Sequence, residues 1–240
     1  MMTCDTYGTL YGIGVGPGDP DLIPLKAIKA LQKVALIFAA ASSKNPHSQA
    51  VSVARPHLPA AVEVRLLKFP MTKDAAEKNA AWRTHAETIL AELAKGRSTA
   101  FLTLGDPLTY ATYGYVLTQI KALKPEAPVV TIPGITSFQA AAARVNRPLV
   151  EGEESLLILS GVEGGQQLRK YGAAVDNVVF LKAYRHLGDI AAALEECDML
   201  PASVAVANCS RENEEVITDV KGLARRDPTY WTLVMAKKTR

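Results

Sequence analysis

The segment "LYGIGVGPGDPDL", residues 10–22, combines a short apolar run with glycine at positions 12, 14, 16 and 18. A dinucleotide-binding loop needs G-x-G-x-x-G opening directly into a helix, and an acidic residue about 20 positions later. Here the third glycine is displaced, and the next apolar run ends in Ala39 and Ala40. The segment instead predicts a strand and a tight turn, in which Gly16 and Gly18 permit positive φ and Pro17 fixes its own φ.

Two interpretations of this turn stay open at the level of sequence. The glycines either serve backbone shape alone or let a ligand approach the backbone closely. The start of the following helix is also open. Either Asp19 caps it with Pro20 at its first position, or it begins one turn later at Pro24.

Composition indicates a folded protein with a sizeable core. The chain has 240 residues, 48% of them hydrophobic, enough to bury the core of one large or two compact domains. Lysine and arginine number 27 against 24 acidic residues, without a dense run of like charge. This excess suits an anionic ligand at least as well as a nucleic acid.

The spacing of cysteines and histidines indicates the redox environment of the protein and whether it binds a metal. Cys4, Cys197 and Cys209 form no C-x-x-C pair, which favours reduced thiols. Because we find neither a signal-like N-terminus nor an apolar run of about 20 residues, we expect a cytoplasmic protein without a membrane partner. The four histidines show no metal-binding spacing, so we expect no metal site.

Short apolar runs alternate with helical stretches along the whole chain, which predicts largely parallel strands in the first half. The expected strands lie in segments 8–15, 34–40, 61–67, 98–104 and 128–133, with helices over 24–33, 48–57, 74–95 and 109–123. A second series of strands lies in 155–161, 177–184, 203–208, 214–219 and 230–238, with helices over 166–174 and 189–197. We therefore predict two α/β domains, residues 1–125 and 126–240, divided near the proline-containing segment 124–128.

Two further strands run into polar loops, GDPLTY at 105–110 and PGITS at 133–137. Ligands of parallel α/β sheets gather at the carboxyl ends of the strands, so these loops and the glycine-rich turn should converge. Asp106 could accept hydrogen bonds or take a proton, and Thr136 and Ser137 offer hydroxyls. Each of these residues could also be an ordinary cap or turn residue.

Taken together, GVGPGD, LTLGDPLTY, IPGITSFQAAAA and the closing YWTLVMAKK resemble the tetrapyrrole methylases. The resemblance covers nearly the whole chain. Within the family, GTLYGIGVGPGDP, FPMTKD and EGEESLLILSG are most similar to the enzymes that methylate carbon 20 of precorrin-2 or cobalt-factor II. It implies two α/β domains with the active site in the cleft between them, usually as a homodimer, using S-adenosyl-L-methionine and releasing S-adenosyl-L-homocysteine.

The resemblance also implies roles for individual residues. Pro17 should pack beside the cofactor, with Asp106 as the candidate that removes a proton from the methylated ring or, alternatively, only orients the reactants. The full set of expected cofactor-binding residues is Pro17, Gly105, Asp106, Pro107, Tyr110, Thr136, Ser137, Leu181, Lys182 and Ala207. The last three match positions whose backbone meets adenine and ribose. We interpret Cys209 as a small apolar residue near the adenosine.

The substrate implied by the resemblance is an anionic ring edged with carboxylates. Candidate partners for these carboxylates, each of which could equally be a solvated surface charge, are Lys44, Arg55, Lys68, Lys73 and Arg83. We place Tyr110 in the cleft and leave Tyr113 and Tyr115 open between core and substrate. The alternatives are methylation at another corrin or sirohaem position, an RNA methyltransferase, and a non-catalytic tetrapyrrole carrier. We expect no nucleic acid partner, because basic and aromatic residues do not cluster along the sequence.

Overall fold

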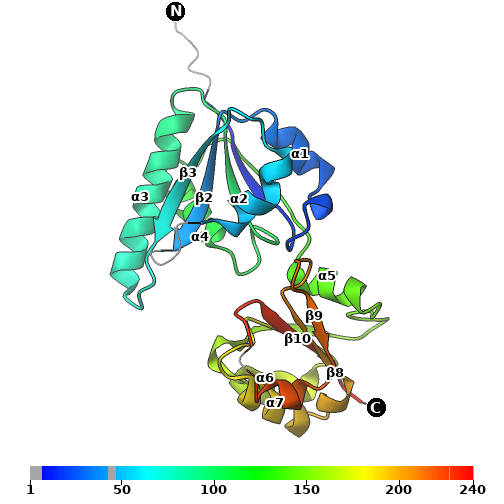
Figure 1. Ribbon diagram of the computed structural model, residues 1–240. Helices are drawn as coiled ribbons and strands as arrows, with labels where there is room; N and C mark the ends of the chain where they lie inside the picture. The colour runs from blue at the N-terminus through cyan, green and yellow to red at the C-terminus, as the bar shows by residue number, and fades with distance from the viewer. Residues whose placement is uncertain (1–6, 43–46, 227, 240) are drawn as a thin grey trace, which may run out of the picture. The chain divides into compact units, whose positions relative to one another are not determined.

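The computed structural model describes residues 7–42, 47–226 and 228–239, in which the alternating apolar runs form two five-stranded sheets in two units (Figure 1). The first unit extends to Thr136 and the second begins at Ser137. This division falls later than the expected one after residue 125. The reason is that β5 (Val129–Ile132) pairs in parallel with β1 (Leu10–Gly14) and so completes the first sheet.

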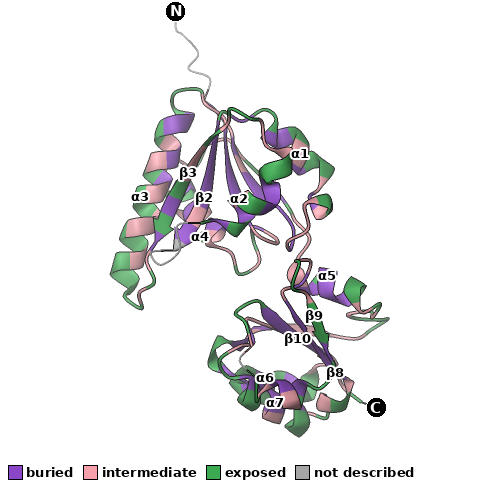
Figure 2. Ribbon diagram, in the orientation of Figure 1, coloured by how far each residue is buried: buried purple, intermediate pink, exposed green. Residues whose placement is uncertain are grey.

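The first sheet is wholly parallel, as its apolar runs predict. Its strand order is β3-β2-β4-β1-β5, and the three strands not yet introduced are β2 (Leu36–Ser42), β3 (Glu63–Phe69) and β4 (Thr99–Thr103). Helices α1 (Leu25–Leu31) and α2 (Gln49–Ala54) pack on one face, and α3 (Ala75–Leu93) and α4 (Thr112–Leu123) on the other. Because both faces are covered, the central strands are buried along their length (Figure 2).

Local sequence signals fix the helix ends in this unit. Asp19 accepts a hydrogen bond from Asp21 N at 2.9 Å and caps a short 3-10 turn at Pro20–Leu22, whereas Pro24 is the N-cap of α1. The first interpretation therefore holds for the 3-10 turn, whereas α1 begins one turn later at Leu25, with Pro24 as its N-cap and not as its first residue. Asp74 caps α3 in the same manner, and the chain turns after this helix at Gly96 with φ +74°.

The second sheet is mixed, with strand order β6-β7-β10-β8-β9. Its strands are β6 (Leu156–Ser160), β7 (Asn177–Leu181), β8 (Ser203–Ala207), β9 (Glu215–Ile217) and β10 (Thr232–Lys237). Only β6 and β7 pair in parallel, since β10 runs antiparallel to both β7 and β8. The central position of β10 places the start of this strand beside the carboxyl ends of β7 and β8.

Helices of the second unit pack mainly against one face of this sheet. They are α6 (Gln166–Tyr171), α7 (Leu187–Glu196) and the short α8 (Val220–Leu223), which the sequence pattern did not predict. The preceding α5 (Ser137–Arg144) opens the unit directly after the PGIT loop. No helix in the described parts of the chain has the length and apolar character needed to cross a membrane.

Candidate functional site

Three loops of the first unit meet at the carboxyl ends of β4, β1 and β5, which are neighbours in the sheet. Gly105 N donates a hydrogen bond to Gly16 O at 2.6 Å, and Gly16 N donates to Gly105 O at 3.3 Å. Gly134 N donates to Asp106 Oδ2 at 3.2 Å. The expected convergence of the glycine-rich turn, the GDP loop and the PGIT loop is therefore present as a set of direct contacts.

The glycines of β1 permit close packing within the protein. A Cβ added to Gly14 would lie 2.6 Å from both Gly105 O and Gly134 N, far inside van der Waals contact. A Cβ on Gly12 would overlap the ring of Tyr113, a fully buried residue of α4 whose hydroxyl lies 3.0 Å from Thr131 Oγ1. The first two glycines of the opening motif thus serve backbone and aromatic packing.

Gly105 differs from these glycines because it borders open space. Its φ is +70°, and a Cβ built there would meet only Ile135 O, at 4.0 Å. The left-handed backbone explains why glycine occupies this position. The open side leaves a stretch of main chain at the loop junction that a ligand can approach closely, which is the property a cofactor-binding loop requires.

Asp106 holds the junction together. Its Oδ1 accepts hydrogen bonds from Leu108 N at 2.9 Å and from Thr109 Oγ1 at 3.1 Å, while Oδ2 accepts from Gly134 N. The carboxylate therefore closes its own turn and ties the GDP loop to the PGIT loop. This geometry favours the orienting role over proton removal.

The remaining first-unit candidates border the same junction. Pro17 and Pro107 are buried in their loops, whereas Thr136 and Ser137 are partly exposed where the PGIT loop enters α5. Tyr110 has φ +50° and is 52% exposed, which makes it available to a ligand.

The two tyrosines that the sequence left open are now assigned. Tyr113 belongs to the core between the first sheet and α4. Tyr115 is half-exposed and stacks on Trp82 of α3, with ring centroids 4.2 Å apart. Neither residue is required to contact a ligand.

The basic candidates are less organised than the loops. Arg55, Lys68 and Lys73 are exposed, and Arg83 pairs with Glu87 one helical turn away at 3.0 Å between Nε and Oε1. Lys44 lies outside the described residues. We therefore continue to interpret these side chains as solvated surface charges.

In the second unit, the expected residues end two strands that flank β10. Lys182 follows β7 with φ +59°, and Ala207 is buried at the end of β8. Asn208 has φ +51° and its N donates to Trp231 O at 3.1 Å. Left-handed backbone is uncommon outside glycine, so the surrounding structure constrains the main chain at these strand ends. Sequence reasoning did not single out Asn208 or Trp231, because neither belongs to a glycine or acidic motif.

Cys209 follows Asn208 in this turn. The side chain is buried, and burial raises the pKa of its thiol to about 11. The thiolate needed for nucleophilic catalysis is therefore disfavoured. This agrees with the interpretation of Cys209 as a small apolar residue.

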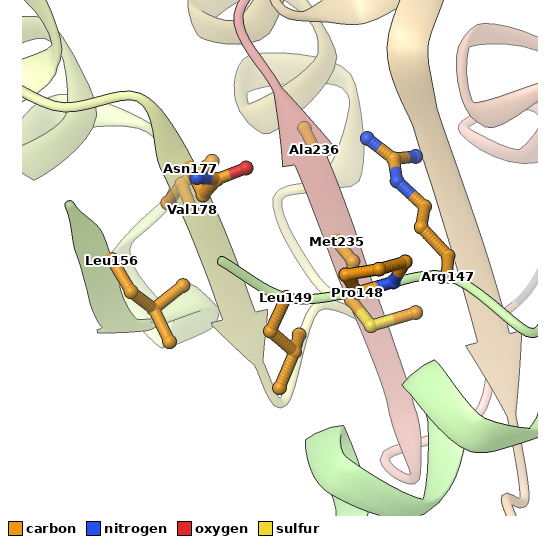
Figure 3. Close-up of a pocket in the computed structure, with 8 residues that line it drawn as sticks. All are labelled: Arg147, Pro148, Leu149, Leu156, Asn177, Val178, Met235 and Ala236. Atoms are coloured by element: carbon orange, nitrogen blue, oxygen red, sulfur yellow. The ribbon is translucent and has the colours of Figure 1, made fainter. Parts of the chain in front are cut away.

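A small cavity elsewhere in the second unit is not a cofactor site. Figure 3 shows Arg147 extended beside Ala236 of β10, with Pro148 and Leu149 closing the space toward Met235. Its volume of about 10 Å³ is near the minimum for one water molecule. No group of three or more histidine, cysteine or acidic side chains in the described ranges is arranged to hold a metal ion.

Comparison with known proteins identifies the class to which this fold and loop junction belong. The family model of the tetrapyrrole (corrin/porphyrin) methylases matches residues 9–224. The chain therefore belongs to the tetrapyrrole methylases. The sheets of both units and the three converging loops all lie within the matched range, apart from the last strand, β10.

Curated relatives narrow the similarity within the family. The chain is 33% identical over 208 residues to cobalt-precorrin-2 C(20)-methyltransferase of Salmonella typhimurium, covering 87% of this chain and 86% of the relative. It is 32% identical over 239 residues to precorrin-2 C(20)-methyltransferase of a Sinorhizobium species, covering 95% and 94% of the two chains. One relative is named for a cobalt-containing ring and the other for the metal-free ring.

Solved structures agree on the fold. Uroporphyrin-III C-methyltransferase of Thermus thermophilus, complexed with S-adenyl homocysteine, matches with a TM-score of 0.68 and 20% identity, over 96% of this chain and 92% of that one. Cobalt precorrin-4 methyltransferase, CbiF, matches with a TM-score of 0.68 and 19% identity, over 95% and 94% of the chains. At these identities the likeness shows the two-unit α/β fold alone.

Proposed function

We propose that this protein transfers a methyl group from S-adenosyl-L-methionine to carbon 20 of precorrin-2, or of its cobalt-containing counterpart, in cobalamin biosynthesis. The products are the methylated ring, S-adenosyl-L-homocysteine and the proton that the methylated carbon loses. The observation that carries the proposal is the junction of three loops around the open backbone of Gly105. It occurs in a chain 32–33% identical to enzymes named for C(20) methylation.

The residues present fit the cofactor. When bound, S-adenosyl-L-methionine supplies an electrophilic methyl group on a positively charged sulfur. We assign its amino-acid end to the main chain at Gly105 and to Pro107, Tyr110, Thr136 and Ser137, with Pro17 packed alongside. The backbone at Leu181, Lys182 and Ala207 is assigned to adenine and ribose. The corresponding cleft shared by the two units stays a prediction.

The chain's contribution to the reaction is mainly positioning. Holding two reactants at near-attack distance is worth about 7–11 kcal/mol, more than the roughly 10²- to 10⁴-fold that one acid or base supplies. Gly105 lets the methyl donor approach the main chain closely. The hydrogen bond from Gly134 N to Asp106 keeps the two loops at a fixed separation, and the hydrogen bond from Leu108 N to Asp106 shapes the GDP loop itself. Asp106 therefore acts as a positioning residue in this proposal.

The proposal also includes the cellular location and the oligomeric state of the protein. We infer a cytoplasmic enzyme, because its relatives are biosynthetic enzymes named for small-molecule substrates. We also infer a homodimer, which sedimentation of the purified protein would test. The anionic substrate fits the net charge of +3.

The experiment that tests the function is incubation with methyl-labelled S-adenosyl-L-methionine and either precorrin-2 or cobalt-factor II. Mass spectrometry should show one added methyl group, and carbon NMR should place it at carbon 20. A methyl group at another carbon would assign the protein to a different step. No methylation of either ring by folded protein would overturn the proposal.

The role of Asp106 is tested by Asp106→Asn. The amide retains only one acceptor oxygen, so at least one of the bonds to Gly134 N, Leu108 N and Thr109 must be lost. We expect S-adenosyl-L-homocysteine to bind about 10-fold more weakly, with turnover at saturating cofactor within about 3-fold of wild type. A turnover loss of about 10²-fold or more at saturation would instead identify a proton-transfer residue.

A further inference from the structure

Aromatic rings and basic side chains gather in the second unit where β7 and β8 end and β10 begins. We call this group the aromatic-cation cluster. Its members are Lys182, Tyr184, Arg185, Arg211, Tyr230 and Trp231. None of these residues takes part in the loop junction of the first unit.

Ring contacts make the cluster continuous. Tyr230 lies edge-on to Tyr184 with centroids 5.4 Å apart, and edge-on to Trp231 at 5.0 Å. The Lys182 ammonium is 5.9 Å from the Tyr230 centroid. The Arg211 guanidinium carbon lies 4.0 Å from Trp231, and the Arg185 guanidinium carbon 5.1 Å from Tyr184. Each cation therefore rests near a ring face of the same chain of aromatic contacts.

The backbone holds this arrangement in place. Asn208 N donates to Trp231 O, and Ala183 N donates to Thr232 O at 2.9 Å. These bonds join the turns after β7 and β8 to the start of β10. Tyr230 and Trp231 nonetheless remain 42% and 39% exposed. Large aromatic side chains that are fixed and exposed together are typical of a binding surface.

The cations of the cluster have no carboxylate partner among the described residues. Three acids close to these cations in the sequence have other partners: Glu214 pairs with Arg144, Asp189 with Arg169, and Glu215 with Arg226. Within the part of the chain that the structure describes, Nη2 of Arg211 is buried and has no hydrogen-bond partner. A guanidinium group left in this state is costly, and an anion that completes its hydrogen bonding is favoured.

The charge selects between the two ligands of the proposed reaction. S-adenosyl-L-methionine carries a sulfonium cation, which is repelled by three basic groups that have no carboxylate partner among the described residues. The ring substrate carries several carboxylates on its rim and a broad apolar surface. Guanidinium groups bind carboxylates through two parallel hydrogen bonds, and exposed aromatic rings can pack on the surface of the macrocycle.

We propose that the aromatic-cation cluster binds rim carboxylates of the anionic tetrapyrrole substrate, with Tyr230 and Trp231 against the apolar surface of the ring. This inference rests on the proposed function. It leaves the backbone at Lys182 and Ala207 free for adenosine, because the cluster uses side chains.

The test measures equilibrium binding of cobalt-factor II and, separately, of S-adenosyl-L-homocysteine to full-length Arg185→Gln and Arg211→Gln. We expect each substitution to raise the Kd for cobalt-factor II by about 3- to 10-fold and to change the Kd for S-adenosyl-L-homocysteine by less than about 2-fold. Ring binding by wild type should also weaken more steeply with salt than ring binding by the double variant.

The matched control is Lys170→Gln. Lys170 lies 4.9 Å over the ring of Tyr171 at the end of α6, which precedes β7 in the chain, whereas the cluster lies where β7 ends. Its substitution removes one cation from an exposed ring without touching the cluster and should leave both Kd values unchanged. Arg185 is exposed, so Arg185→Gln keeps the test decisive if Arg211→Gln does not fold.

Two results would overturn the assignment. One is an unchanged Kd for cobalt-factor II in folded Arg185→Gln. The other is loss of S-adenosyl-L-homocysteine binding with ring binding intact, which would make the cluster part of the adenosine site. Failure of the proposed function is distinguishable, since wild type would then methylate neither ring.

Discussion

Replacing Gly14 by alanine tests whether the loop junction depends on close backbone packing. Gly14 is the last residue of β1, and its Cα faces both other loops. An added Cβ would lie 2.6 Å from Gly105 O and from Gly134 N, whereas ordinary contacts begin at 3.4 Å. All of these neighbours are main-chain atoms, so no side-chain rotation can relieve the overlap.

The loss of stability follows from the movement of the two loops that the added methyl group requires. Relieving the overlap needs a shift of about 0.8 Å in each loop, which overpacks a tightly built site and costs about 1–3 kcal/mol. The same shift would stretch the bond from Gly134 N to Asp106 Oδ2, now 3.2 Å, past hydrogen-bonding range. Its loss adds about 1–2 kcal/mol. We expect Gly14→Ala to lower the free energy of unfolding of the first unit by about 2–5 kcal/mol.

The assay is urea unfolding followed by tryptophan fluorescence in a Trp231→Phe background. The chain has two tryptophans, so Trp82 of α3 then reports on the first unit alone. The matched control is Gly114→Ala inside α4, where an added Cβ meets nothing within 4 Å. The control should be about 0.5–1 kcal/mol more stable than its parent, because alanine is the better helix former. A loss below about 0.5 kcal/mol in Gly14→Ala would refute the packing argument.

Two further predictions concern the open side of the junction and the stability of the first unit in acid. Gly105→Ala should cost only about 1–2 kcal/mol of stability for a left-handed alanine, yet weaken S-adenosyl-L-homocysteine binding at least about 10-fold in calorimetry, because its methyl group enters the space assigned to the cofactor. Unchanged affinity would remove Gly105 from the site. Glu92 is buried and pairs with Arg65, Arg97 and Lys95 at 2.8–3.1 Å. The hydrogen bond from Arg65 is the largest cause that lowers the pKa of Glu92 from 4.5 to about 2, and the hydrogen bond from Lys95 lowers it further. Its stabilisation is complete above pH 4.5 and is lost as the pH falls toward 2, so Glu92→Gln should unfold with a flatter pH dependence over that range; an unaltered slope would contradict this.

The strands and the order of the loops followed from the sequence. Residues 34–40 and 100–102 form runs that are apolar throughout, and a parallel strand covered on both faces requires that pattern. The turns could be located because glycine, proline and aspartate punctuate a chain locally. Parallel pairing of the strands is enough to predict that the GDP and PGIT loops lie beside the first turn.

The role of each glycine was decided only by tertiary structure. Gly12, Gly14 and Gly105 look alike in the sequence, but Gly12 faces an aromatic ring, Gly14 faces two backbones and Gly105 faces open space. Which atoms surround a missing Cβ depends on segments 30 to 120 residues away, and no local pattern encodes them.

The same holds for Asp106 and for the aromatic-cation cluster. A carboxylate after glycine can act as a base or hold loops in place, and the hydrogen bonds from Gly134 N and Leu108 N to Asp106 favour the second role. Arg211 and Trp231 are 20 positions apart and share no sequence motif. They come into contact because β10 lies between β7 and β8 in the sheet. Local propensity determined the elements of this protein, whereas long-range pairing of the strands determined which side chains meet.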